Sequence, residues 1–220
     1  KLVWINSPAN PHGAVMSRAH LTRWVAFARR SGAILAADEC YGEFVWEGQA
    51  LSVLDYDICQ GNHSGLLAVH SVSKRSNMAG YRAGFVAGDA NLVQELVAVR
   101  KHLGMMVPAP VQAALTAVLD DDAAVQEQAA RYAARREVLR PALVAAGFTI
   151  ADSAGGLYLW ATQGVNCRET LDWLAELGIL VAPGDFYGAS GANYVRIALT
   201  ATDERIQAAA TRLLATRPLK

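Results

Sequence analysis

The sequence contains few cysteines and no long apolar run. Its three cysteines, Cys40, Cys59 and Cys167, are far apart and form no C-x-x-C pair. An odd, scattered set argues against a disulfide framework and against a zinc site, so we expect no metal and a protein of the reducing cytoplasm. We interpret the three as small core residues. No apolar segment approaches the ~20 residues that cross a bilayer, which argues against a membrane protein.

The sequence also lacks an excess of either charge, because 20 basic side chains balance 20 acidic ones. Without a basic surface, the chain is not expected to bind nucleic acid or an anionic membrane. The first residues, "KLVWIN", resemble a buried strand and show neither an initiator Met nor a signal-peptide pattern. We therefore expect that residues belonging before Lys1 are missing from this chain.

Apolar strand-like runs alternate with helical periodicity in the first half of the chain. The runs are "LVWIN", "AILAAD", "GLLAVHS" and "YRAGFVAG". Between the first two, apolar residues at helical spacing follow Ser17, a good N-cap, and end at Gly32. Near-continuous apolar strands separated by helices predict an α/β fold with a mostly parallel sheet covered on both faces.

The second half has a different pattern. A long helix is expected over about residues 123–146, followed by short strands in "FTI", "GLYLWAT", "ILVAPG" and "YVRIALT". One helix lies among these strands, and a last helix begins near Thr202, with two acidic residues in its first turn. We therefore expect a larger α/β domain over residues 1–122 and a smaller α+β domain over residues 123–220 that includes the long helix.

Three polar segments follow predicted strands, where open α/β sheets place their ligands. They are "NSPANPHG" (residues 6–13), "DECY" (residues 38–41) and the segment around Lys74. Taken singly, each has a simple structural explanation: a turn, a helix cap and a solvated lysine. Taken together and in order, they indicate a binding site.

The segment "SVSKRSNMAGYRAG" (residues 71–84) carries a family resemblance, with Arg82 eight residues after Lys74. Together with the two other segments and with "NYVRIALT", which contains Arg196, it resembles the class I and II aminotransferases of fold type I, which use pyridoxal 5'-phosphate (PLP). The resemblance covers the whole chain and corresponds to the carboxyl-terminal part of a family member. It implies that the first domain is the carboxyl-terminal part of the large PLP-binding domain.

The resemblance implies a role for each matching residue. Lys74 would bind the cofactor covalently and then move the α-proton of the substrate as general base and acid. Asp38 would hold the pyridine nitrogen protonated, which makes the ring an electron sink. Tyr41 and Asn10 would hydrogen-bond the phenolic oxygen of the ring.

The remaining matches would hold anionic groups. Arg82, Ser71 and Ser73 would bind the cofactor phosphate. Arg196, with Asn10, would bind the substrate α-carboxylate, because a guanidinium fork matches a planar carboxylate. By itself, Arg196 is equally compatible with an edge-strand arginine paired to a surface acid. The Asn10–Pro11 bond resembles a family turn in which the proline is commonly cis.

Several residues near these segments are given other roles. His70 is interpreted as a packed core histidine, and Glu39 as support for the site or as a partner of a surface residue. The loop "APGDFYG" (residues 182–188) would line the pocket without reacting. The aromatic side chains of the small domain are expected in its core: Tyr158, Trp160 and Trp173.

Longer stretches, including "VRKHLGMMVPAPVQAAL" and "VRIALTATDERI", resemble the actinobacterial succinyldiaminopimelate aminotransferases of lysine biosynthesis. This resemblance implies a cytoplasmic homodimer that transfers an amino group between glutamate or 2-oxoglutarate and N-succinyl-diaminopimelate. The alternatives are another PLP aminotransferase, a carbon–sulfur β-lyase of the same fold, or an inactive fragment. Because other parts of the site are absent, we expect this chain alone to bind PLP weakly.

Overall fold

The computed structural model describes residues 1–216 and divides into two compact units. The first unit consists of Lys1–Pro8 and Val15–Glu127; the second consists of Ala9–Ala14 and the chain from Gln128 onward. The division between the units falls within helix α6 (Asp122–Ala145), and a short N-terminal loop belongs to the second unit, whereas the sequence placed a domain boundary between residues 122 and 123. The assignment of these units to a large and a small PLP-enzyme domain stays a prediction.

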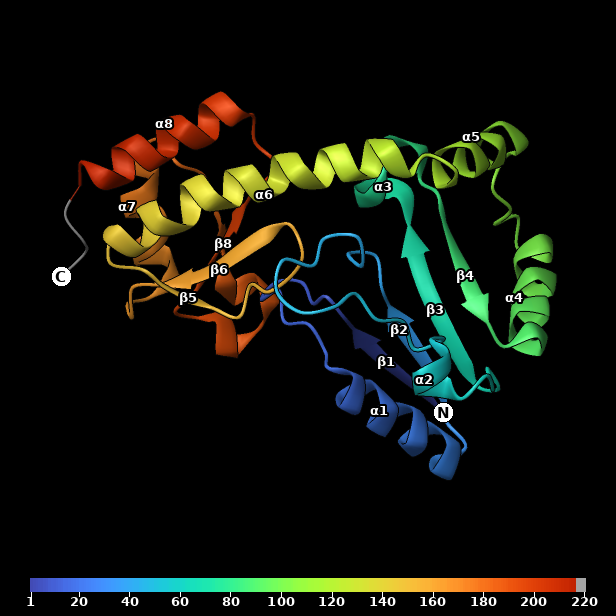
Figure 1. The fold of residues 1–220 in the computed structure, drawn as a ribbon. Coiled ribbons are helices and arrows are strands. Elements are labelled where there is room, and N and C mark those ends of the chain that lie inside the picture. Colours follow the sequence, from blue (N-terminus) through green and yellow to red (C-terminus); the bar gives the residue numbers. More distant parts are fainter. Residues whose placement is uncertain (217–220) are drawn as a thin grey trace. The chain divides into compact units, whose positions relative to one another are not determined.

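The first unit contains a four-stranded sheet in the order β1-β2-β3-β4 (Figure 1). Its first three strands are parallel and β4 is antiparallel to β3, as expected for a mostly parallel sheet. The last strand begins later than predicted, because a 3-10 turn, η1 (Ala79–Tyr81), precedes it and Arg82 has a φ of +54°. The strands are β1 (Leu2–Asn6), β2 (Ile34–Asp38), β3 (Leu66–Ser71) and β4 (Gly84–Gly88).

Helix α1 (Arg18–Ser31) covers one face of this sheet. The Ser17 hydroxyl accepts a hydrogen bond from the His20 N–H at its start, and Gly32, with a φ of 63°, ends it, so both predicted caps are confirmed. Its buried side chains pack with those of the three parallel strands and of α2 (Tyr56–Cys59). Each large apolar side chain in such a core contributes about 1.5–3 kcal/mol relative to exposure.

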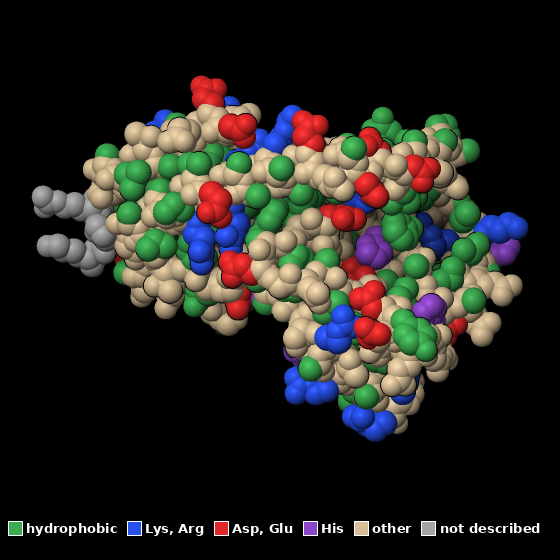
Figure 2. Space-filling view, viewed as in Figure 1, with side chains coloured by type: hydrophobic (Ala, Val, Ile, Leu, Met, Phe, Trp, Pro, Cys, Tyr) green, Lys and Arg blue, Asp and Glu red, His purple; other side chains and the backbone are tan. Residues whose placement is uncertain are grey.

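Two further helices of the first unit, α4 (Ala90–His102) and α5 (Ala109–Leu119), leave their apolar side chains uncovered. Neither helix contains a buried residue, and hydrophobic side chains are visible at the surface over both (Figure 2). Asp89 begins α4, and its carboxylate accepts hydrogen bonds from the backbone N–H groups of Gly65, Leu92 and Asn91, which hold its pKa below the ordinary value. Among the described residues, no helix is both long and apolar enough to cross a membrane.

The second unit contains an antiparallel sheet in the order β5-β6-β8-β7. Strand β7 is shorter than the sequence predicted, because the 3-10 turn η2 (Gly184–Tyr187) follows it at once. The elements are β5 (Thr149–Ala151), β6 (Tyr158–Thr162), α7 (Cys167–Glu176), β7 (Ala182–Pro183), β8 (Val195–Ala198) and α8 (Asp203–Leu214).

The two faces of this second sheet differ in chemistry. Leu159 and Ile197, which are paired across β6 and β8, are buried. Because successive side chains of a strand point to opposite faces, Tyr158, Trp160 and Arg196 share the other face, where Trp160 lies opposite Arg196. The second sheet therefore places an arginine among aromatic rings.

Candidate active site

The ends of β2 and β3 bring two predicted cofactor residues to one face of the first sheet. Asp38 is paired with Val69 in the parallel register. Since side chains alternate along a strand, Ser71 shares the face of Val69 and Asp38, whereas Glu39 and His70 lie on the opposite face. The Asp38 carboxylate is half-buried and accepts a hydrogen bond from the Cys40 backbone N–H (3.1 Å). Tyr41 follows at once and is buried.

Lys74 lies on a short helix, α3 (Val72–Arg75), rather than in a simple turn. The Ser71 hydroxyl accepts a hydrogen bond from the Ser73 N–H (3.1 Å) and so begins this helix. The Lys74 side chain is half-buried, and within the part of the chain that the structure describes its amine has no hydrogen bond or ion pair. A partly desolvated amine without a partner is available to a bound ligand.

The connection between β3 and β4 returns Arg82 to the neighbourhood of Ser71. Ser71 is paired with Gly84 across the antiparallel strands, and the Val72 N–H points to the Ala83 carbonyl (3.4 Å). Arg82 is exposed, and its Nη1 donates to the Ala79 carbonyl (2.8 Å). The connection between β3 and β4 therefore contains or adjoins all four residues predicted around the cofactor phosphate and amine: Ser71, Ser73, Lys74 and Arg82.

Arg75 anchors this connection, a role that the sequence analysis missed. Its guanidinium, 11% exposed, lies 2.6 Å from an Asp122 carboxylate oxygen and 3.2 Å from one of Glu43, and Nη1 donates to the Val118 carbonyl (2.6 Å). These contacts fix the residue next to Lys74. Motif matching could not find them, because the partners lie 32 to 47 residues away.

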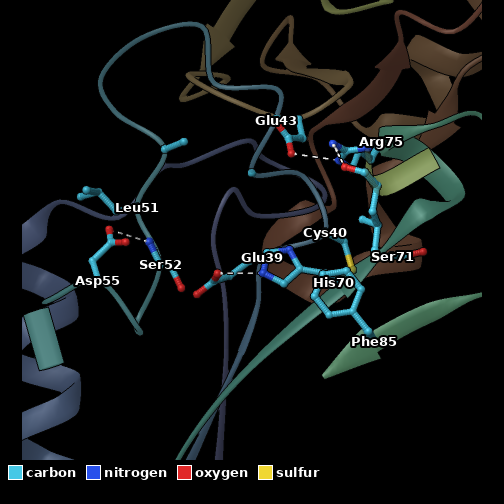
Figure 3. Close-up of a pocket in the computed structure, with 13 residues that line it drawn as sticks. Glu39, Cys40, Glu43, Leu51, Ser52, Asp55, His70, Ser71, Arg75 and Phe85 are labelled. Atoms are coloured by element: carbon cyan, nitrogen blue, oxygen red, sulfur yellow. Dashed lines mark hydrogen bonds and ion pairs between the residues drawn. The ribbon is translucent and has the colours of Figure 1, made fainter. Parts of the chain in front are cut away.

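A cavity of about 400 Å³ opens beside the ends of β2 and β3 (Figure 3). Ser71 and Cys40 line it together with Glu39 and His70, and the segment after β2 adds Glu43, Ser52 and Asp55. Asp38 and Lys74 do not line it. Of the predicted cofactor residues, Ser71 is therefore the one that lines this cavity.

Cys40 lies between these two faces. Burial raises the pKa of its thiol to about 12, and the hydrogen bond and negative charge of Asp38 act in the same direction. The group therefore remains a neutral thiol next to Asp38 under physiological conditions. Cys59 and Cys167 are also free thiols and are buried.

We expect the thiol of Cys40 to react with iodoacetamide about 10³-fold more slowly at pH 8 than an ordinary cysteine, because only the thiolate is nucleophilic. Its rate should still rise between pH 9 and 11, below its pKa of about 12, whereas an ordinary thiol with the reference pKa of 9.0 levels off. Mass spectrometry of the alkylated peptide measures the rate, with the urea-unfolded chain as control. A folded-state plateau near pH 9 would contradict the raised pKa.

Arg196, in the second unit, contacts two aromatic rings. The centre of its guanidinium lies 3.9 Å from the centroid of the Tyr158 ring and 5.1 Å from that of Tyr187. Its Nη1 donates to the Asn10 side-chain oxygen (2.9 Å), so the structure joins two residues that the sequence predicted at the substrate carboxylate. Among the described residues Arg196 forms no ion pair, and its buried Nε has no partner. The alternative of a surface ion pair is therefore not what the structure shows.

The loop that carries Asn10 is fastened to the second unit. Its Asn10–Pro11 bond is cis. The Ser153 N–H donates to the His12 carbonyl, and the Gly155 N–H donates to the Gly13 carbonyl, both at 2.8 Å. These contacts hold the loop next to the sheet that bears Arg196.

A glycine is required at position 13, where this loop closely approaches the backbone of residues 153–155. Its φ is +74°, and a Cβ added there would lie 2.6 Å from the Gly155 carbonyl oxygen and 2.8 Å from the Ser153 Cα. We expect Gly13→Ala to lower the free energy of unfolding by about 2–4 kcal/mol, through left-handed strain and overpacking. Urea denaturation measures the change. Gly164→Ala is the matched control, since Gly164 has a φ of +81° but no atom within 4 Å of an added Cβ; equal losses would contradict the argument.

The two tyrosines at Arg196 were not identified as site residues in the sequence. Tyr158 was assigned to the core, although strand alternation places it on the face of Arg196. Tyr187 lies in the loop that was expected to line the pocket. Arg168 fastens this loop with two hydrogen bonds to Asp185 (2.8 and 2.9 Å), which lower the pKa of that carboxyl group.

The side chains of the first unit suit PLP chemically. An unpaired amine can bond to its carbonyl carbon, the Asp38 carboxylate suits its ring nitrogen, and Arg82 with Ser71 suits its phosphate. The described residues contain no group of three or more His, Cys, Asp or Glu side chains that could hold a metal ion. The donor set thus matches an anionic, aldehyde-bearing heteroaromatic cofactor.

A mostly parallel sheet that ends in these residues is typical of the fold-type I transferases that use PLP. The model of the family "Aminotransferase class I and II" matches residues 1–213. The chain therefore belongs to this family of PLP-dependent aminotransferases, which confirms the family and the fold expected from the sequence.

Two curated relatives are similar over almost the whole chain. One is a probable aminotransferase of Mycobacterium tuberculosis, 58% identical over 96% of this chain and 51% of the relative. The other is the 4-dedimethylamino-4-oxo-anhydrotetracycline transaminase OxyQ of Streptomyces rimosus, 60% identical over 97% of this chain and 59% of the relative. The chain thus spans little more than half the length of these relatives.

Solved structures agree with the fold. An aminotransferase from Neisseria meningitidis superposes with a TM-score of 0.88 at 32% identity, covering 98% of this chain and 57% of the other. A probable N-succinyldiaminopimelate aminotransferase from Thermus thermophilus gives a TM-score of 0.86 at 30% identity, covering 98% and 58%.

Proposed function

We propose that this chain carries the cofactor lysine and the substrate arginine of an aminotransferase that exchanges an amino group between glutamate or 2-oxoglutarate and another keto acid. The observation that best supports the proposal is the position of Lys74. Its amine is half-buried and unpaired among the described residues. Lys74 follows β3 directly, and the end of β3 lies beside the end of β2, where Asp38 is located. The proposal includes catalysis within a cytoplasmic homodimer.

Each residue has a role in this proposal. Lys74 removes the α-proton of the amino acid and returns a proton to the keto acid carbon. Asp38 keeps the ring nitrogen protonated, and Tyr41 with Asn10 donates to the phenolic oxygen. Bound PLP supplies the electron sink for the carbanion. Arg82, Ser71 and Ser73 bind the phosphate.

Arg196 orients the substrate. A guanidinium held by Tyr158 and Tyr187 has lost much of its rotational freedom before the substrate arrives, so less entropy is lost on binding. Its contact with Asn10 links the carboxylate fork to the loop that donates to the cofactor oxygen. This arrangement favours α-amino and α-keto acids over ligands without a carboxylate.

The keto acid partner is proposed to be the keto form of N-succinyl-diaminopimelate. This choice rests on sequence resemblance, and a structural neighbour at 30% identity carries that name. The relatives at 58% and 60% identity carry other names, one of them a transaminase of a tetracycline intermediate. The same site chemistry would serve another keto substrate, so the acceptor is the part of the proposal that most needs a direct test.

The proposal is tested by the reaction with glutamate alone. A polypeptide containing residues 1–220 is saturated with PLP, mixed with glutamate and freed of small molecules. Transamination yields one 2-oxoglutarate and one pyridoxamine phosphate per site, and the aminated protein then converts N-succinyl-2-amino-6-oxopimelate to its amino form. Release of pyruvate and ammonia from cysteine or cystathionine, without 2-oxoglutarate from glutamate, would instead establish a β-lyase.

A further inference from the structure

Glu39 and His70 form a side-chain pair on the face of the first sheet opposite Asp38 and Ser71. Glu39 Oε2 lies 3.3 Å from His70 Nε2, and the two side chains point toward one another (Figure 3). The Glu39 side chain is only 5% exposed. A buried carboxyl group is stable only with polar partners, and for Glu39 these are His70 and the Val53 N–H.

The pair connects several elements. The second Glu39 oxygen, Oε1, accepts a hydrogen bond from the Val53 N–H (2.9 Å) in the loop before α2. The Glu39 N–H donates to the Val69 carbonyl (2.9 Å), which extends the pairing of β2 with β3. On the other side, the His70 ring stacks on Phe85 of β4, with centroids 5.0 Å apart and planes 19° apart. The pair therefore ties together the ends of three strands.

Each member of the pair is adjacent in sequence to a proposed cofactor residue. Asp38 precedes Glu39, and Ser71 follows His70, with side chains on the opposite face. A cofactor bound at both its ring nitrogen and its phosphate needs those partners held within about 0.5 Å of their productive separation. If Glu39 and His70 rotated or moved apart, the backbone would carry Asp38 and Ser71 with them.

We infer that Glu39 and His70 are positioning residues that set the spacing between the ring-nitrogen and phosphate partners of PLP. Neither side chain touches the cofactor; both act through their neighbours. The inference rests on the proposed function. It differs from a role in stability alone, because it predicts a change in how bound PLP is held.

The first test is His70→Phe, which keeps a ring for stacking on Phe85 but cannot donate to Glu39. We expect the Kd of PLP to rise about 10- to 100-fold, the equivalent of one hydrogen bond to a charged group. The visible circular dichroism of bound PLP should also fall, because it reports the asymmetric hold on the ring. His70→Gln, which restores an N–H donor, should recover affinity and dichroism to within about threefold. His63→Phe, at an exposed loop position, is the matched control and should change neither.

The second test is a double-mutant cycle with Glu39→Leu. If the two side chains act as one unit, His70→Phe should weaken PLP binding no further once Glu39 is replaced. Additive losses would overturn the inference, as would a His70→Phe variant that unfolds at lower temperature but binds PLP with unchanged affinity and dichroism. Those outcomes would overturn the inference alone. Failure of the unsubstituted protein to bind PLP at Lys74 would instead overturn the proposed function and this inference with it, so the two failures are distinguishable.

Discussion

Replacing Lys74 with alanine is expected to abolish covalent capture of PLP by the chain. Borohydride reduction of the PLP-saturated protein, followed by peptide mapping, should place the pyridoxyl label on Lys74 in the unsubstituted chain and on no peptide in the variant. Transaminase activity of a polypeptide containing these residues should fall at least about 10³-fold, because the same amine moves the α-proton. The physical reason is that Lys74 is the lysine in the short helix that directly follows β3.

The chain offers a clear control for this experiment. It contains four lysines, Lys1, Lys74, Lys101 and Lys220, and Lys101 is exposed in the last turn of α4. Lys101→Ala should leave labelling and activity unchanged. A label that moves to Lys101, or that persists at full stoichiometry without Lys74, would refute the assignment of the cofactor lysine.

Replacing Arg196 with lysine is expected to raise the KM for the amino acid about 10- to 100-fold and to leave PLP capture at Lys74 unchanged. Lysine keeps the positive charge, but it lacks the planar fork and the stacking surface that Tyr158 and Tyr187 contact. The loss corresponds to about one charge-assisted hydrogen bond to the carboxylate. Steady-state kinetics with varied glutamate measures the effect.

The matched substitution is Arg205→Lys, because Arg205 is exposed on α8 and, among the described residues, stacks on no aromatic ring. It should change neither KM nor PLP capture. If Arg196→Lys altered PLP capture while leaving the KM for glutamate unchanged, Arg196 would belong to the cofactor rather than to the substrate, and the proposed division of roles would be wrong.

The predicted secondary structure agreed with the structure where local rules suffice. Ser17 and Gly32 bound α1 because a hydroxyl cap and a left-handed glycine act within a few residues. The β3–β4 connection was less accurate, because a helix of four residues and a left-handed Arg82 leave no periodic signal. Short elements of this kind are selected by tertiary contacts, here those of Arg75 with Asp122 and Glu43.

The pairing of Glu39 with His70 shows the limit of reading residues one at a time. In the sequence His70 appeared to be a core histidine and Glu39 a supporting or surface acid. Strand alternation places both on one face, but only the register of β2 against β3 makes them neighbours. Hydrophobic pattern alone does not determine that register where Glu39 follows β2 and His70 is the second-last residue of β3.

The sequence by itself determined the order of the longer strands and helices, the family and the set of side chains that suit PLP, because these depend on local pattern and on motifs of fixed spacing. Only the tertiary structure decided which side chains meet. It joined Asn10 to Arg196, which lie 186 positions apart, and brought that guanidinium to the rings of Tyr158 and Tyr187. The physical reason is that contacts across sheets depend on register and loop path, and these are set by the packing of the whole unit.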